Sequence, residues 1–287
     1  MSERDPIVRI NSLPPDEGPV DRRPLPRRED RCRLLSPELQ ASLEREIVVA
    51  LLPSLARITH RSETSLHPDL AAAVSEFFPL YEQRPVQNNT GGSLFNDSLS
   101  LYLTARLLVP TLIVESGTFR GHSAWLLRHA CPEAEILSFD IDLSQLEHRE
   151  PDVTYYEGDW TDFPLPAIAA ELALIWFDDH INQAMRLHEA HNRGFRRTLF
   201  DDNFPAYNLY ATGGAPVPTL AMAIDESLHD GMRLVWTRHR KTYEYVYKQS
   251  HTFDVQSLIC LCQPLPDLVH ITRYSPSSAL TYVETVP

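Results

Sequence analysis

The fold class of this chain is indicated most clearly by the stretch Thr111-Leu-Ile-Val-Glu115-Ser-Gly117-Thr-Phe-Arg-Gly121-His-Ser123. It begins with a short apolar run that is typical of a buried strand, and its two glycines permit a tight turn directly before a helix. A helix that starts behind such a turn offers free backbone N–H groups to a ligand. The stretch therefore predicts a strand, a turn and a helix that together bind a small molecule.

Apolar strands and helices alternate around this unit. We expect helices at 94–107, 121–130, 182–191 and 218–229, and strands at 111–114, 135–140, 153–156, 172–177, 197–200, 232–237 and 243–248. Short strands separated by helices imply a parallel sheet that is covered on both faces. The last two strands follow each other without a helix and suggest an antiparallel edge. The expected α/β fold is a Rossmann-like, doubly wound, mostly parallel sheet of seven strands with an antiparallel edge.

The residues before this core are interpreted as a tail and a helical extension. Residues 1–33 are rich in Pro, Arg, Asp and Glu, and this composition buries too little apolar surface to offset the entropy of ordering. Ser36 and Pro37 begin an amphipathic helix that runs to about Ile58, and a second helix is expected at 68–81. The expected organisation is a flexible tail at 1–33, a helical N-terminal extension at 34–87, the core at 88–250 and a C-terminal extension at 251–287.

The composition limits the partners and the compartment. The 287 residues carry a formal net charge of -13, which disfavours a nucleic-acid partner because binding phosphates needs clustered Lys and Arg. No apolar run of about 18 residues predicts a membrane span, and no apolar signal core precedes residue 31, so we expect a cytoplasmic protein. The four cysteines lack zinc-ligand spacing and are expected to be reduced thiols. The uncharged face of the 36–58 helix favours a homo-oligomer, a dimer or larger.

Acidic residues follow the next two strands where a nucleoside would bind. A dinucleotide site prefers the fuller pattern GxGxxG, but Phe119 occupies the position that should approach a pyrophosphate. Asp140 ends the 135–140 strand, and its carboxylate can accept both hydroxyls of a ribose. Asp159 and Trp160 follow the 153–156 strand. The acid can bind the amino group of an adenine, and the aromatic ring can stack on the adenine ring. The alternative is that these carboxylates are merely solvated loop residues.

These residues resemble the first three motifs of class I S-adenosylmethionine (SAM) methyltransferases. The motifs are carried by Glu115-Ser-Gly117-Thr-Phe-Arg-Gly121, Asp140 and Gly158-Asp159. The resemblance implies that Asp140 binds the ribose of SAM and that Asp159 or Trp160 lies beside its adenine. It also implies a loop at 88–92 over the methionine end. The other cofactor-binding residues that it implies are Glu115, Gly117, Thr118, Gly121, Ser123 and Asp178.

Carboxylates also follow the strands at 172–177 and 197–200, as Asp178-Asp179-His180 and Asp201-Asp202-Asn203. The carboxyl ends of neighbouring parallel strands meet at one crevice, so these acids should converge. Like charges placed so close favour a bound cation, and hard oxygen ligands select Mg²⁺. The alternative is that they are capping acids or groups that hydrogen-bond a substrate.

This second arrangement resembles the metal-dependent O-methyltransferases of macrolide sugars and the related cephalosporin hydroxylases, over about residues 88–250. The resemblance implies that Asp178, Asp201 and Asp202 bind the metal and that His180 is the general base. The branch usually has two residues between that Asp and His, whereas only Asp179 intervenes here. Asp179 is therefore an alternative metal ligand or catalytic residue.

The expected reaction is methyl transfer from SAM to an oxygen of a small hydroxylated molecule, in natural-product tailoring, with Mg²⁺ holding the acceptor. The loop at 204–216 follows the acidic pair and is expected to be a substrate lid. Two alternatives keep the SAM site: a metal-independent methyltransferase, and a non-catalytic protein that binds SAM. A nicotinamide oxidoreductase is disfavoured because GxGxxG is missing.

Overall fold

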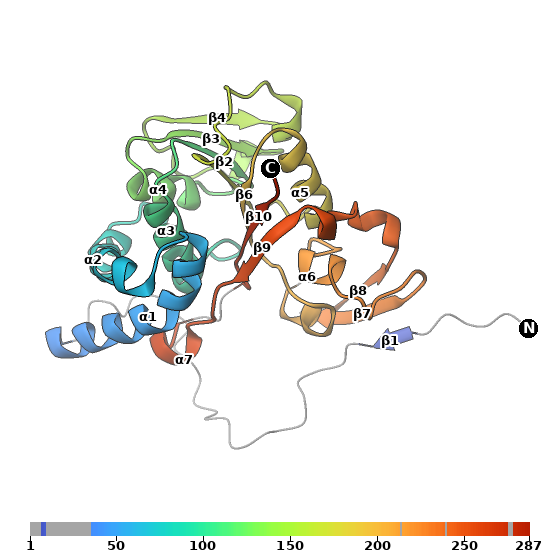
Figure 1. Cartoon of the computed structure of the whole chain (residues 1–287), viewed down its shortest axis with the longest axis horizontal. Helices are drawn as coiled ribbons and strands as arrows, with labels where there is room; N and C mark the ends of the chain where they lie inside the picture. The colour runs from blue at the N-terminus through green and yellow to red at the C-terminus, as the bar shows by residue number, and fades with distance from the viewer. Residues whose placement is uncertain (1–6, 10–35, 213, 239, 275–277) are drawn as a thin grey trace, which may run out of the picture.

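The computed structural model describes residues 7–9, 36–212, 214–238, 240–274 and 278–287 (Figure 1). Apart from residues 7–9, the tail expected at 1–33 lies outside the described residues. The helices are α1 (Pro37–Ile58), α2 (Glu63–Glu82), α3 (Phe95–Leu108), α4 (His122–Ala130), α5 (Gln183–Asn192), α6 (Leu220–Ala223) and α7 (Val269–Thr272). Short 3-10 helices are η2 (Leu143–Gln145), η3 (Trp160–Asp162), η4 (Ala206–Ala211), η5 (Gln249–Thr252) and η6 (Val255–Ser257).

The main sheet has seven strands in the order β4-β3-β2-β5-β6-β10-β9. These strands are β2 (Leu112–Ser116), β3 (Glu135–Asp140), β4 (Val153–Glu157), β5 (Ala173–Phe177), β6 (Arg197–Phe200), β9 (Ile259–Pro264) and β10 (Thr281–Thr285). The five strands from β4 to β6 are parallel, and β10 pairs antiparallel with both β6 and β9. The chain order reverses beside β2, since β3 lies on one side and β5 on the other. The expected Rossmann-like α/β sheet, mostly parallel with seven strands, is confirmed.

The antiparallel strands of this sheet are not the expected ones. The segments expected at 232–237 and 243–248 are β7 (Arg233–Arg238) and β8 (Lys241–Val246), which form a separate sheet with β1 (Ile7–Arg9). Along β7 the buried residues alternate with more exposed ones, as in a sheet with one face toward water. In contrast, every residue of β10 is buried. The prediction missed β10 because the charged Glu284 interrupts its apolar pattern.

The two faces of the main sheet are covered by different helices (Figure 1). Successive side chains of a strand point to opposite faces. Ile113 and Trp176 pack with helices α1 to α4, whereas Val114 and Ile175 pack with α5 and α6. This is the doubly wound arrangement. The helices cover the two faces of the sheet, and the edge at the carboxyl ends of the parallel strands stays available for a ligand.

The N-terminal helices confirm the expected pattern with one shift. Ser36 caps α1, where its hydroxyl accepts a hydrogen bond from Leu39 N at 3.3 Å. The second helix begins at Glu63 rather than at Pro68, because Ser62 provides the cap and accepts from Ser65 N. The apolar face of α1 packs inside the chain, so it gives no support to the expected oligomer, which stays a prediction.

The helix expected at 218–229 is wrong in length, since α6 has only four residues. Asp225 follows its end, and its carboxylate accepts hydrogen bonds from the backbone N–H and the hydroxyl of Ser227. Such local side-chain bonds compete with a helix for the backbone. Across the described residues, no helix has the length and apolar character that crossing a bilayer requires.

Candidate functional site

A cavity of about 370 Å³ opens at the carboxyl ends of β2, β3, β4 and β5. This is the edge of a parallel sheet where such folds bind ligands. Its walls combine glycines, apolar side chains and acids: Gly91, Gly92, Gly117, Gly158, Phe119, Phe139, Ile141, Ile181, Asp140, Asp159, Asp178 and Asp179. Ser116, His180 and Arg186 complete the lining. Two residues of the loop at 88–92 therefore line the cavity, and the expected position of this loop over the methionine end of SAM stays a prediction.

The glycines of the turn after β2 are required by close backbone packing. Gly117 has φ +106°, and a Cβ there would lie 2.4 Å from the carbonyl oxygen of Asp178. Gly121 has φ +86°, and a Cβ there would lie 2.1 Å from the carbonyl oxygen of His148. Gly117 lines the cavity, whereas Gly121 packs on the segment behind it. Only the first glycine thus keeps the backbone open toward a ligand.

Glu115, Thr118 and Ser123 lie beneath the turn rather than on the cavity wall. The carboxylate of Glu115 is fully buried and accepts a hydrogen bond from the hydroxyl of Ser138, which is 2.5 Å from that of Thr118. Burial raises the pKa of Glu115 to about 7, although hydrogen bonds with Ser123 and Ser138 lower it. The direct contact with SAM expected from Glu115 does not match this placement, because the carboxylate supports the turn from inside.

Asp140 lies where the sequence predicted, at the end of β3 on the cavity wall. Its Oδ2 accepts a hydrogen bond from Phe119 N at 2.8 Å, and its Oδ1 accepts one from Asp142 N at 3.1 Å. Each carboxylate oxygen can accept about two hydrogen bonds, so both retain capacity for a ligand. Ile141, which follows it, also lines the cavity and is largely exposed.

Asp159 lines the cavity but the neighbouring Trp160 does not. The Trp160 ring is fully buried between Phe177 and Phe195, with the guanidinium of Arg193 5.0 Å from its centroid. The expectation that Trp160 stacks on an adenine is therefore wrong in this structure. Phe119, Phe139 and Ile141 provide the apolar wall instead.

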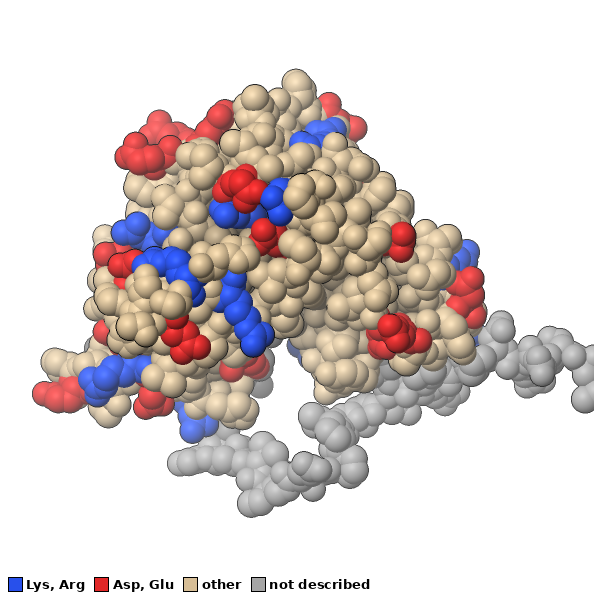
Figure 2. Space-filling model, viewed as in Figure 1, with Lys and Arg blue, Asp and Glu red and all other residues tan. Residues whose placement is uncertain are grey.

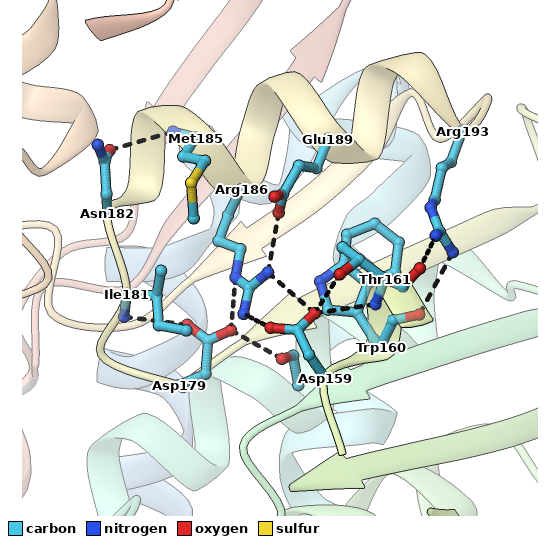
Figure 3. A network of polar contacts seen from close by, with 11 residues as sticks. Asp159, Trp160, Thr161, Asp179, Ile181, Asn182, Met185, Arg186, Glu189 and Arg193 are labelled. Carbon is cyan, nitrogen blue, oxygen red and sulfur yellow. Dashed lines mark hydrogen bonds and ion pairs between the residues drawn. The ribbon is translucent and has the colours of Figure 1, made fainter. Parts of the chain in front are cut away.

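Arg186 of α5 is a site residue that the sequence interpretation missed (Figure 3). Its side chain is 2% exposed and forms ion pairs with Asp159 at 2.6 Å, Asp179 at 2.8 Å and Glu189 at 2.8 Å. We call these three acids the paired acids. An Arg on the helix face that carries the buried Leu187 and Ala190 was the signal that could have revealed it.

The paired acids include Asp179, which the sequence offered as an alternative base or ligand. Its Oδ2 accepts hydrogen bonds from Ser116 Oγ at 2.7 Å and from Arg186 Nε at 2.8 Å, and its Oδ1 accepts one from Ile181 N. Both oxygens of Asp179 thus already accept hydrogen bonds, and its role as a metal ligand or a catalytic residue stays a prediction.

A second group of acids gathers beside the cavity, and we call it the acidic cluster. It consists of Asp97, Asp178, Asp201 and Asp202. Burial raises the pKa of each carboxyl. For the three acids that follow β5 and β6, neighbouring acids raise the pKa further or neighbouring cations partly offset the rise. The sequence interpretation missed Asp97, which lies on α3 and accepts a hydrogen bond from Ser278 N at 2.8 Å.

His180 lies between two acids of this cluster. Its Nε2 is 3.9 Å from Asp178 Oδ1, its Nδ1 is 3.6 Å from Asp202 Oδ2, and the side chain is 49% exposed. The same Nδ1 is 3.0 Å from the carbonyl oxygen of Gly214, in the loop expected to be a lid. The ring is therefore open to a ligand on one side and held by acids on the other.

The acidic cluster supplies donor chemistry that suits a hard cation. Within the described ranges, neither Lys nor Arg forms an ion pair with Asp178, Asp201 or Asp202, and His180 lies at ion-pair distance from Asp178 and Asp202 but not from Asp201. Burial is the largest cause of their raised pKa values, and the charges of Asp178 and Asp202 raise the pKa of Asp201 further. Carboxylate oxygens of this kind are the ligands that a hard divalent ion prefers. However, the described side chains include no group of three or more His, Cys, Asp or Glu arranged to hold a metal ion.

No protein-family model and no curated protein matches this chain. Among solved structures, a CmcI structure with SAH is 20% identical over 39% of this chain and 62% of that chain, with a TM-score of 0.34. The chain thus spans less than two thirds of that protein's length. A putative O-methyltransferase from Klebsiella pneumoniae is 16% identical over 68% and 82%, with a TM-score of 0.43. A methyltransferase from Geobacter sulfurreducens is 14% identical over 75% and 89%, with a TM-score of 0.42. With similarity this weak, the function has to follow from the site itself.

Proposed function

We propose that this chain is a SAM-dependent methyltransferase that transfers a methyl group to an oxygen of a small hydroxylated molecule. One observation carries the proposal: a single cavity joins the Gly117 turn, Asp140 and Asp159 at the ends of three parallel strands. A glycine turn, an acid for ribose hydroxyls and an acid for a purine amino group are what an adenosine ligand needs. In the absence of GxGxxG, a nucleoside without a pyrophosphate is the favoured ligand.

The adenosine part of SAM would lie along β3 and β4. The carboxylate of Asp140 would accept hydrogen bonds from the ribose hydroxyls, and that of Asp159 would accept one from the purine amino group. Phe139 and Ile141 would contact the base, because they are the apolar side chains beside those acids. The methionine end would then extend past Gly117 toward Asp178 and the loop with Gly91 and Gly92.

The methyl transfer itself needs an aligned acceptor and a route for its proton. The acceptor oxygen forms a bond to the methyl carbon while the carbon–sulfur bond breaks, and the electron pair stays on sulfur to give S-adenosylhomocysteine (SAH). Holding the two molecules in line supplies much of the rate. His180 would take the hydroxyl proton, since its ring is half exposed and lies between Asp178 and Asp202.

We also propose Mg²⁺ as a cofactor, held by Asp178, Asp201 and Asp202. When bound, the ion would supply positive charge that stabilises the oxyanion of the acceptor. Metal-independent transfer is the second candidate, because the described part of the chain lacks a ready group of three ligands. A role in natural-product tailoring and a cytoplasmic location stay predictions. On the face that Figure 2 shows, Lys and Arg lie among Asp and Glu, which fits an acceptor that is not a nucleic acid.

Calorimetry with SAM and SAH tests the proposal directly. We expect the wild type to bind both, and Asp140→Ala to lose most of that affinity because it removes both acceptors for the ribose. Asp142→Ala is the matched control, since Asp142 is a neighbouring exposed acid away from the cavity. A wild type that binds neither nucleoside would contradict the proposal. Activity toward vicinal diols with and without a chelator then separates the metal-dependent candidate from the metal-independent one.

A further inference from the structure

Arg186 connects the ends of three strands that surround the cavity (Figure 3). Asp159 follows β4, Asp179 follows β5, and Asp179 also accepts a hydrogen bond from Ser116 at the end of β2. The guanidinium reaches both acids at once from α5. Its planar fork of donors suits this bridging, which a Lys ammonium cannot reproduce.

The hydrogen bonds on Asp159 leave one of its oxygens with spare capacity. Oδ1 accepts from Thr161 N at 2.9 Å, from Thr161 Oγ1 at 2.7 Å and from Arg186 Nη1 at 3.2 Å. Within the described chain, Oδ2 accepts only from Arg186 Nη2, at 2.6 Å. A carboxylate oxygen accepts about two hydrogen bonds, so Oδ2 can take one more donor. The side chain is 26% exposed and lines the cavity, where that donor would come from.

Two contacts from Arg186 also fix the rotation of this carboxylate. A bidentate pair of Arg with a carboxylate holds the group in one plane, whereas a single contact lets it turn. A carboxylate held in this way accepts hydrogen bonds and donates none. It therefore favours an amino group over a carbonyl at the same place on a ligand.

We propose that Arg186 is a positioning residue that aims Asp159 Oδ2 at the purine amino group of SAM and thereby sets the preference of the site for adenine. This inference rests on the proposed function and goes beyond it, because it assigns base selectivity to a side chain that need not contact the base. Removing the fork would free Asp159 to rotate, and the site would lose its distinction between an amino group and a carbonyl.

Arg193 offers a matched control at the C-terminal end of the same helix. It also holds the turn that carries Asp159, through hydrogen bonds to the carbonyl oxygens of Trp160, Thr161 and Phe163. Unlike Arg186, its hydrogen bonds in the described chain go to backbone carbonyls and not to carboxylates. A loss of selectivity that arises only from loosening this turn would therefore appear in Arg193→Gln as well.

The test compares the dissociation constants of SAH and of its inosine analogue, in which a carbonyl replaces the amino group. Calorimetry would measure both for the wild type, Arg186→Gln, Arg186→Lys and Arg193→Gln. We expect the wild type to prefer SAH at least about tenfold, as for one hydrogen bond to a charged group. Both Arg186 variants should lose most of that preference, whereas Arg193→Gln should keep it.

Each outcome separates the inference from the proposed function. If the wild type binds neither ligand, the proposed function fails. If it binds SAH and the Arg186 variants keep the full preference, the inference alone is overturned. Equal loss in Arg193→Gln also overturns it. Lys keeps a positive charge beside the acids, so Arg186→Lys should fold even if Arg186→Gln does not. If neither variant folds while Arg193→Gln does, Arg186 is a folding residue and the inference is wrong.

Discussion

The paired acids and the acidic cluster lie in the same site but differ in what balances their charge. Arg186 forms ion pairs with all three paired acids. Burial raises the pKa of Asp159, but hydrogen bonds from Arg186 and Thr161 outweigh it and bring the pKa to about 2. In the acidic cluster, burial raises the pKa of every member. The guanidinium of Arg186 thus keeps Asp159 charged, whereas no Lys or Arg of the described chain forms an ion pair with the acids that follow β5 and β6 in the acidic cluster.

The largest expected effect comes from removing the cation of the paired acids. Arg186→Leu should lower the free energy of unfolding by about 2–3 kcal/mol, because it removes the buried cation that pairs with three partly buried carboxylates. Urea unfolding measures this loss. Arg193→Leu is the control and should lose less, since its partners are uncharged carbonyls. Equal losses in the two variants would mean that the ion pairs do not account for the difference.

Adding a divalent cation should stabilise the folded protein through the acidic cluster. If the acidic cluster binds Mg²⁺, an excess of about 100 times the dissociation constant should raise the free energy of unfolding by about 2.7 kcal/mol. The double variant Asp201→Asn/Asp202→Asn should show no such gain. Thermal or urea unfolding with and without the ion provides the measurement. An equal gain in the double variant would place the ion elsewhere.

Glu115 is a third kind of acid, because it is fully buried and forms no ion pair with a described residue, and it should make stability depend on pH. Its pKa is raised to about 7 from the usual 4.5, so the folded state favours the protonated form. That stability is present below about pH 4.5 and is lost as the pH rises through about 7. Glu115→Gln should therefore gain on the order of 2 kcal/mol relative to the wild type between pH 5 and pH 8. Urea unfolding of both proteins at the two pH values measures this gain. A stability difference between them that is the same at both pH values would contradict the prediction.

The smallest expected effect concerns Trp160, which follows the paired acid Asp159 in sequence but faces away from the cavity. Trp160→Phe should change the affinity for SAH by less than about twofold, because Trp160 does not line the cavity. Ile141→Ser is the contrast and should weaken binding by about tenfold, since Ile141 is an exposed apolar part of the wall. Calorimetry compares the two. A large loss of affinity in Trp160→Phe would mean that the Trp160 ring contacts the ligand after all.

The sequence allowed the prediction of features that depend on neighbours along the chain. The apolar run before Glu115, the glycines after it and Asp140 at the end of its strand are all local signals. The structure finds β3 at Glu135–Asp140 and β6 at Arg197–Phe200, with the expected bounds. Local apolar patterns determine such strands because burial on both faces requires continuous apolar residues.

Features that depend on distant contacts escaped prediction. Glu284 in β10 is buried because His60 and Arg196 pair with it, and neither partner is close in sequence. Asp97 joins the acidic cluster from α3, and its contact with Ser278 spans most of the chain. The role of Trp160 was misjudged for the same reason, since a ring next to a site acid can point either into the cavity or into the core.

The position of β10 has a consequence for how the protein is made. This strand is the last of the seven along the chain, yet it lies between β6 and β9. During synthesis, β6 therefore keeps an open edge until residue 285 has left the ribosome. Unpaired strand edges attract other strands, so this interval is when the growing chain is most prone to aggregate. The sheet thus cannot close until the last of its seven strands has emerged.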